Sequence, residues 1–300
     1  MSTNLVLDIA ILALLWAGVG AAWNLLAGYA GQFSLGHGAF FGIGAYGSTL
    51  AFLHWGVRPW LGSLIGIAAA ILLAVVIGVV GMRTRGPFFT LITIAFAEVV
   101  RILTIYFSEL TKGSEGLILP FKADPANMIF EGKLPFLAIT AVYAAGTLAF
   151  CHWLRQSRLG YALLANREDE DAARALGVFT FRSRIAALSM SATITAFGGT
   201  VFAQYTLFID PDSTMSFLLS VKPALITIIG GLGAAAGPLL GACLVVPLEY
   251  LLRAWFGGGL AGLHGVIFGV ILILVLFAMP SGLIQPLRLL FGRRGSSQHA

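Results

Sequence analysis

Long runs without a charged residue are the feature of this sequence that most constrains its fold. A membrane-spanning helix needs about 20 consecutive apolar residues, and each run is long enough for one or two such helices. Charged residues make up only 10% of the 300-residue chain, whereas soluble domains carry about 25%. The sequence therefore predicts an all-α fold, a polytopic transmembrane helical bundle. No Asp, Glu, Lys or Arg occurs in Ile9–Val57, Pro59–Met82, Leu134–Leu154, Ile185–Ile209, Pro223–Leu248 and Ala254–Leu287.

Residues that would support other function classes are scarce or scattered. The basic residues stand in short segments between apolar runs, which indicates membrane topology and not a nucleic-acid surface. Cys151 and Cys243 lie far apart inside apolar runs, so we expect neither a disulfide framework nor a metal cluster. No cluster of His, Cys and carboxylates has catalytic spacing, which argues against a membrane enzyme and a bound cofactor. The N-terminus lacks the basic segment of a signal peptide, so the first run is expected to remain as a span.

The expected number of spans is about nine, within a range of about eight to ten. Each half of the chain is expected to contain one broken, glycine-rich helix. The expected segments are spans at Leu5–Leu26, within the glycine-rich stretch Gly28–Leu53, at Trp60–Met82 and at Phe88–Phe107, a polar loop at Ser108–Lys133, a span at Leu134–Leu154, a charged loop at Arg155–Arg184, a span at Ile185–Phe208, and three spans up to Met279 with breaks near Gly230–Pro238 and Gly257–Gly265.

The distribution of basic residues predicts the orientation, because cytoplasmic loops carry an excess of Lys and Arg. The loop Arg155–Arg184 contains six arginines and is therefore expected in the cytoplasm. The loop Ser108–Lys133, with balanced charge, and the N-terminus are then expected outside. The other basic residues expected in the cytoplasm are Arg83, Arg85, Arg288, Arg293 and Arg294.

The segment Gly28–Tyr46 combines many glycines with a group of polar residues, Gln32, Ser34 and His37. Close helix packing explains the glycines, but it does not explain the polar group. Irregular backbone at membrane depth is tolerated only where it is buried in protein or lines a wet cavity. The segment therefore indicates a discontinuous helix beside a translocation path, and His37 is interpreted either as a structural histidine or as a ligand or proton carrier.

A second glycine-rich segment, Gly230–Gly241, lies in the other half of the chain. It has no flanking βαβ pattern, so a dinucleotide-binding loop is disfavoured. Its Gly-x-x-x-Gly spacings fit close helix packing, and Pro238 adds a break. Paired interruptions in the two halves indicate a transport site between internal repeats, although the halves show no residue-by-residue repeat.

Glu98 and Arg101 stand three residues apart inside an expected span, so they share one helix face. Ionisable residues within a span are costly and usually face the bundle interior. Two interpretations stay open: an ion pair within the helix near its cytoplasmic end, or a gate or partner contact.

The charged loop contains five consecutive charged residues at the membrane surface and a possible helix end at Gly177. A solvated loop is one interpretation, and a short helix bound by a soluble partner is the other. The chain has no Gly-x-x-x-x-Gly-Lys-Ser/Thr phosphate loop, so any ATP that drives it must bind elsewhere. The five residues are Arg167, Glu168, Asp169, Glu170 and Asp171.

Several stretches, in this order, resemble the permease subunits of branched-chain amino-acid ABC importers, of the LivH/LivM type and closer to LivM. They cover nearly the whole chain, and the ordered set is more specific than any one of them. Lys112 and Glu115 depart from the small or polar residues that are more frequent in the family. The matching stretches are Asn24–Tyr46, Arg85–Phe89, Phe96–Arg101, Thr111–Gly116, Ser157–Gly160, Arg167–Gly177, the Gly230 run and Pro280–Leu283.

The resemblance implies a single permease domain, residues 1–300, in a bacterial inner membrane, with a coupling loop at 155–184 and a basic cytoplasmic tail at 285–300. It implies a periplasmic solute-binding protein, a second and non-identical permease subunit, and two ATPase subunits that bind the ATP. Arg167–Gly177 would be the coupling helix that docks into an ATPase. Urea or a short amide is the alternative solute. The rival of another class is a proton-coupled secondary transporter with His37 and Glu98 as relays.

Overall fold

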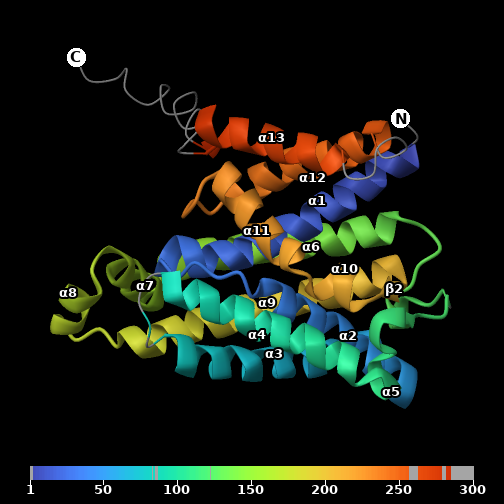
Figure 1. Ribbon diagram of the computed structural model, residues 1–300, viewed down its shortest axis with the longest axis horizontal. Helices are drawn as coiled ribbons and strands as arrows, with labels where there is room; N and C mark the ends of the chain where they lie inside the picture. The colour runs from blue at the N-terminus through green and yellow to red at the C-terminus, as the bar shows by residue number, and fades with distance from the viewer. Residues whose placement is uncertain are drawn as a thin grey trace.

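The computed structural model describes residues 3–82, 84, 87–121, 123–256, 263–278 and 282–284, and these form a helical bundle. Most of the long helices run along the longest axis of the molecule (Figure 1). The short helices α7 and α8 project at one end, and a small antiparallel sheet lies at the opposite end. We call these the α7–α8 end and the sheet end. The all-α prediction is confirmed.

Seven segments among the described residues are long and apolar enough to cross a membrane. They are Thr3–Tyr29, Pro59–Gly81, Pro87–Tyr106, Leu134–Arg155, Thr180–Thr206, Pro211–Gly230 and Gly237–Phe256. The long helices are α1 (Thr3–Asn24, continued by a π-helix at Leu25–Tyr29), α2 (His37–Trp55), α3 (Pro59–Gly81), α4 (Pro87–Tyr106), α6 (Leu134–Arg155), α9 (Thr180–Thr206), α11 (Phe217–Gly230), α12 (Gly237–Phe256) and α13 (Leu263–Ala278).

Shorter elements connect these helices at both ends of the bundle. At the sheet end, β1 pairs with β2 in the register Leu117 to Ile209 and Ile118 to Phe208, which ties the loop before α6 to the segment after α9. The short elements are α5 (Ser108–Thr111), two 3₁₀ helices (Gly113–Glu115 and Pro125–Asn127), β1 (Leu117–Ile118), α7 (Arg158–Glu168), α8 (Glu170–Ala175), β2 (Phe208–Ile209) and α10 (Pro211–Met215).

Glycines let the backbones of α2 and α9 approach closely. A Cβ added to Gly44 would meet the carbonyl of Ala196, and one added to Gly199 would meet the carbonyl of Phe41. Because backbone atoms cannot move aside as a flexible side chain can, these two positions require glycine. The packing interpretation of the glycine-rich segment is thus correct for Gly44.

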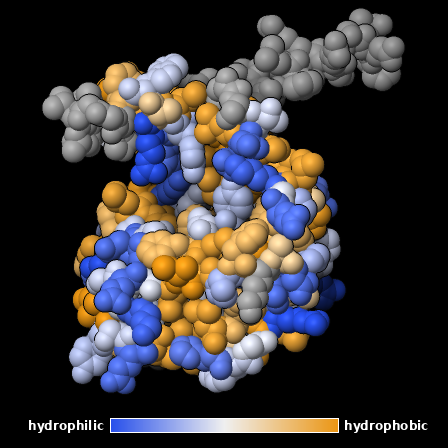
Figure 2. Space-filling view, turned by 90° about the vertical axis from the view of Figure 1, so that its right-hand side faces the viewer, coloured by the Kyte–Doolittle hydropathy of each residue, from blue (hydrophilic) through white to orange (hydrophobic). Residues whose placement is uncertain are grey.

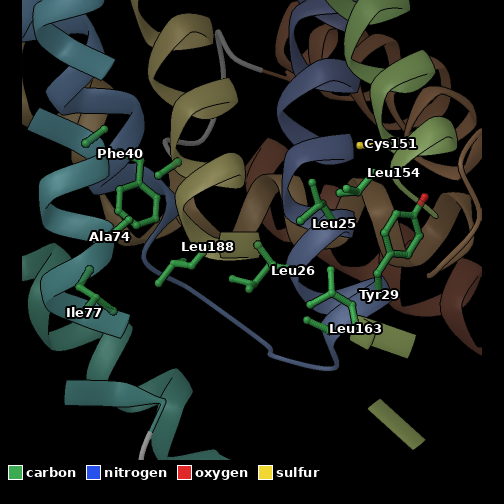
Figure 3. Packing of buried hydrophobic residues seen from close by; sticks show 14 of the residues in the cluster. Leu25, Leu26, Tyr29, Phe40, Ala74, Ile77, Cys151, Leu154, Leu163 and Leu188 are labelled. Atoms are coloured by element: carbon green, nitrogen blue, oxygen red, sulfur yellow. The ribbon is translucent and has the colours of Figure 1, made fainter. Parts of the chain in front are cut away.

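A buried cluster joins the end of α1 to its neighbours near the α7–α8 end. Figure 3 shows Leu25, Leu26 and Tyr29 beside Leu154 of α6 and Leu163 of α7. These side chains are at most 2% exposed. The π-helix at the end of α1 is therefore embedded in the core and is not a frayed helix end.

Helix α9 begins at Thr180, five residues before the expected start of its span at Ile185. Arg184, counted as a loop residue in the sequence, is buried within this helix. Its Nη1 atom lies 2.9 Å from Oε2 of Glu170. The ion pair explains the difference, since it lets a charged residue occupy the buried first turns of a helix.

Parts of the sequence predictions fall outside the described residues. These are Arg83, Arg85, most of the expected break at Gly257–Gly265, and the tail at 285–300 with its three arginines. Where three spans were expected in the last third, the described residues contain the long helices α11, α12 and α13, and the segments Pro211–Gly230 and Gly237–Phe256 are long and apolar enough to cross a membrane.

Candidate functional site

The two broken glycine-rich segments meet in the structure. The first comprises the π-helix Leu25–Tyr29 and the irregular residues 31–36, and the second is the connection 231–236 between α11 and α12. The buried side chain of Asn24 links them: its Oδ1 accepts a hydrogen bond from Gly233 N (2.8 Å), and its Nδ2 donates one to Ala234 O (2.9 Å). One amide thus satisfies two backbone groups of a segment more than 200 positions away.

Arg167 approaches the same place from the charged loop. Its Nη1 atom donates a hydrogen bond to Gly28 O at 2.5 Å. The side chain also lies against both broken segments, because a Cβ added to Gly31 or to Gly233 would come within 3.1 Å of it. Both glycines have positive φ angles, of 68° and 77°, which side-chain-bearing residues rarely adopt. Arg167 therefore contacts both halves of the chain at their interruptions.

Gln32 lies at the edge of this contact. It is half-buried, its backbone N–H donates to Leu26 O (3.2 Å), and it lines a polar cavity of about 330 Å³ together with Arg167 and Glu168. Gln32, one of the three polar candidates in this segment, thus lies beside the charged loop.

Ser34 and His37 lie deeper and bind neighbouring helices. The carbonyl of Ser34 accepts a hydrogen bond from Trp23 Nε1 (2.7 Å). His37 is 0% exposed, and its Nε2 lies 2.8 Å from Ser191 Oγ on α9. Because the Ser191 hydroxyl donates its proton to Ala22 O (2.6 Å), Nε2 of a neutral His37 is the donor. This geometry agrees with the structural interpretation of His37.

Helix α4 holds the rest of the first broken segment. Thr93 Oγ1 accepts from Leu35 N (3.1 Å), and Thr90 Oγ1 donates to Phe33 O (2.8 Å). The irregular backbone is thus satisfied by side chains of the protein, as a non-helical segment at membrane depth requires.

Glu98 and Arg101 form the expected ion pair within α4, and Arg101 has a further partner in Asp212. Arg101 Nη2 lies 2.6 Å from Glu98 Oε1, and Arg101 Nη1 lies 2.9 Å from Asp212 Oδ1. Asp212 belongs to α10, which follows β2 at the sheet end (Figure 1). The sequence did not indicate this further partner, because Asp212 lies more than 100 positions from Arg101 along the chain. Among the described residues no hydrogen bond joins Glu98 to His37, so the two show no connected proton relay.

The charged loop forms two helices and not the single helix expected over Arg167–Gly177. Asp169 separates α7 from α8 with extended backbone angles, φ −153° and ψ 115°. Its Oδ1 accepts from Asp171 N (2.9 Å) and Ala172 N (3.0 Å), so it is the N-cap of α8. Gly177, with a φ of 84°, follows the end of α8 as predicted.

The ion pairs of this loop hold α8 against α9. Glu170 pairs with Arg184 and, in a shorter contact, with Arg174 on its own helix. Glu168 and Asp169 are exposed. Two apolar side chains are also exposed here, Leu176 at 84% and Phe179 at 73%. The sequence analysis missed these two, although apolar residues flanking a charged run were a signal for a docking surface.

The family model described as the permease component of the branched-chain amino acid transport system matches residues 5–276. The chain belongs to this family.

Individual relatives agree with this assignment. The LivM permease protein of the high-affinity branched-chain amino acid transport system of Salmonella typhimurium is 28% identical over 312 residues, covering 94% of this chain and 70% of LivM. The LivH permease protein of Escherichia coli is 26% identical over 284 residues, covering 90% and 91%. The autoinducer 2 import permease LsrC of Yersinia pestis is 31% identical over 226 residues, covering 69% and 61%. No solved structure gives a significant match.

The chain is therefore a multi-pass inner-membrane permease component of the branched-chain amino acid transport family, a transport component and not an enzyme. The predicted resemblance to the LivH/LivM type, closer to LivM, is confirmed.

This permease also has a charged contact inside its spans that the sequence analysis did not single out. Lys222 Nζ of α11 lies 2.6 Å from Glu249 Oε2 of α12 and 4.7 Å from the ring centroid of Trp16. The two residues delimit the charge-free run Pro223–Leu248, but nothing in the run indicated that they pair. Ionisable residues in spans frequently mark functional positions, so this pair is a further candidate for a role in the translocation path.

Proposed function

We propose that this chain is the membrane-spanning subunit of an importer for branched-chain or related amino acids. A periplasmic binding protein delivers the solute, two separate ATPase subunits supply the energy, and a related permease chain completes the pathway. The α7–α8 end faces the cytoplasm, and the sheet end faces the periplasm. The solute class follows the names of the LivM and LivH relatives, and the LsrC relative, named for another solute, makes direct measurement of the solute necessary.

The observation that carries the proposal is the hydrogen bond from Arg167 to Gly28 O. Arg167 is the penultimate residue of α7, two residues before the chain turns at Asp169 toward α8, so movement of this helical pair moves its guanidinium. The same guanidinium lies against both interrupted segments. A partner that displaces α7 and α8 would therefore shift the two interrupted segments relative to each other. In this way, movement of the ATPases would be transmitted to the translocation path.

The surface of α7 and α8 suits a soluble partner whose binding energy comes mainly from contacts with apolar side chains. An exposed ion pair contributes about 0–1 kcal/mol, whereas full burial of a leucine side chain stabilises a contact by about 1.5–3 kcal/mol. We therefore expect Leu176 and Phe179 to contribute more to ATPase binding than Glu168 and Asp169. The charges would select the orientation of docking.

The coupling role is tested by Arg167→Lys in the assembled transporter. Lysine keeps the charge but loses the planar guanidinium that reaches Gly28. We expect the ATPases to co-purify normally while uptake falls by about tenfold, because a hydrogen bond from a charged group contributes about 1.5–3 kcal/mol. Arg158→Lys, on the same helix, is the control. Wild-type uptake in Arg167→Lys would refute the coupling role.

The docking role is tested separately by co-purification of the ATPases with Leu176→Asp and Glu168→Lys. We expect Leu176→Asp to abolish co-purification and Glu168→Lys to weaken it only slightly. A stronger effect of Glu168→Lys would show that charge dominates the contact. Uptake that stops with an uncoupler while ATP is maintained would favour the proton-coupled alternative.

A further inference from the structure

A cavity of about 430 Å³ lies at the sheet end, between the start of α1, the loop before α6, and the ends of α9 and α12. Figure 2 looks onto this end and shows hydrophilic side chains around a hollow. The volume is within the range of sites for small molecules, about 300–1,000 Å³. The site described above, by contrast, lies at the α7–α8 end.

One wall of the cavity carries opposite charges side by side. Asp8 Oδ2 lies 2.6 Å from Lys133 Nζ, and Asp8 Oδ1 accepts a short hydrogen bond from the hydroxyl of Tyr205. Both charged side chains are partly exposed, at 27% and 35%. A carboxylate beside an ammonium is the complement of a molecule that itself carries an ammonium beside a carboxylate.

Gln204 adds a neutral donor and acceptor to the lining. It is 1% exposed, and neither its Oε1 nor its Nε2 has a hydrogen-bond partner among the described residues. A buried amide without a partner costs about 1–3 kcal/mol of stability, so folding alone does not explain glutamine here. Its Oε1 can accept from an ammonium group, and its Nε2 can donate to a carboxylate.

Apart from Glu131 and Gly132, the remaining lining is apolar and largely aromatic. Phe136 packs edge-on against Phe130 and against Tyr205, with ring centroids 5.2 Å apart in both pairs. Leu12 and Ile129 complete this wall, and both are buried. Such a surface accommodates an aliphatic or aromatic side chain and offers it no charged partner.

We propose that this cavity binds a neutral α-amino acid with an apolar side chain. The ammonium is held by Asp8 and Gln204 Oε1, the carboxylate by Lys133 and Gln204 Nε2, and the side chain by the aromatic wall. The lining charges of Asp8, Glu131 and Lys133 sum to −1, so an acidic amino acid is disfavoured. The choice of an amino acid as the ligand class rests on the proposed function. That the ligand is a zwitterion is inferred from the polar groups of the cavity, Asp8, Lys133 and Gln204.

The test is direct binding of radiolabelled L-leucine to the full chain in lipid nanodiscs, without binding protein or ATPases. We expect saturable binding by the wild type. Gln204→Leu should weaken it by about tenfold or more, since each lost hydrogen bond to a charged group corresponds to about a decade in Kd. Asp8→Asn should do the same, whereas Glu115→Gln, an exposed carboxylate at the same end, should bind as the wild type does.

Analogues separate the two charged contacts. 4-Methylpentanoate lacks the ammonium and 3-methylbutylamine lacks the carboxylate, and each should compete with leucine about tenfold less well. Gln204→Leu removes no hydrogen bond of the described protein, so thermal stability equal to or above that of the wild type will show that it folds. Wild-type affinity in a folded Gln204→Leu variant, or no saturable binding by the wild type, would overturn the proposal.

Uptake measurements separate this proposal from the proposed function. If leucine uptake by cells requires this chain but the purified chain binds no leucine, the cavity proposal alone fails. If the purified chain binds leucine as predicted but cells lacking it import leucine normally, the proposed function fails and the cavity stands.

Discussion

The two broken segments are held in different ways. The first, residues 25–36, is fixed by hydrogen bonds from side chains of several helices, among them Trp23 and Thr93. The second, residues 231–236, is fixed by the two bonds from Asn24 and by backbone contacts at glycines. The first segment therefore has anchors in three helices, and the second depends on close packing and on the first half of the chain. We therefore expect the conformation of the second segment to depend more strongly on its neighbours than that of the first does.

The largest expected effect comes from filling the glycine contact beside the second segment. A Cβ at Gly241 would meet the carbonyl of Ile226, a backbone atom that cannot move without shifting α11. We expect Gly241→Ala to destabilise the protein by about 3 kcal/mol, measured as loss of folded, monodisperse protein on heating in detergent. Gly146→Ala is the control, because its added Cβ meets nothing within 4 Å. An unchanged melting temperature in Gly241→Ala would show that α11 and α12 are not packed so closely.

Removing the link between the segments should have an intermediate effect. Asn24→Ala leaves Gly233 N and Ala234 O without their side-chain partner in a buried place. We expect a loss of about 2 kcal/mol and easier hydrogen exchange of Gly233, measured by mass spectrometry of the membrane-embedded protein. Asn127→Ala, in the 3₁₀ helix of the sheet end, should change neither. Unchanged exchange in Asn24→Ala would mean that the second segment holds its own conformation.

The smallest expected effect concerns Ala22 and His37, which flank the first segment, because that segment has several other anchors. Ser191→Ala removes the bond to Ala22 O and the partner of His37 Nε2. We expect a loss of about 1 kcal/mol, measured as a small fall in melting temperature with transport retained. Ser189→Ala, on the same helix, should not change stability. Complete loss of transport in a stable Ser191→Ala variant would instead assign His37 a role in the path.

Local physical constraints explain what could be predicted from the sequence. Most span positions were correct because a bilayer demands an uninterrupted apolar run, and that demand is visible in any window of the chain. The end of α8 at Gly177 was predictable for a similar reason, since positive φ favours glycine. The start of α9 was missed because Arg184 was counted as a loop charge without knowledge of its partner, Glu170.

The candidate site was only partly predictable. The glycine-rich segments and Arg167 were singled out, but Asn24 was not, because its role exists only in contact with Gly233 and Ala234. Asp169 was assigned to a continuous helix, although an aspartate is also a favoured N-cap residue. Leu176, Phe179 and Gln204 were not selected, because their significance depends on exposure or burial that no local pattern reports.

By itself, the sequence determined that this chain is an all-α membrane protein, that each half contains an interruption, and that the charged loop lies between spans. Only the tertiary structure decided that the interruptions meet, that Asn24 and Arg167 join them, and that Asp8, Lys133 and Gln204 line one cavity. The physical reason is that each span must by itself be apolar enough for the lipid bilayer, so hydropathy can be assessed segment by segment. Hydrogen bonds and ion pairs act between particular atoms, and here their partners lie up to about 210 positions apart along the chain.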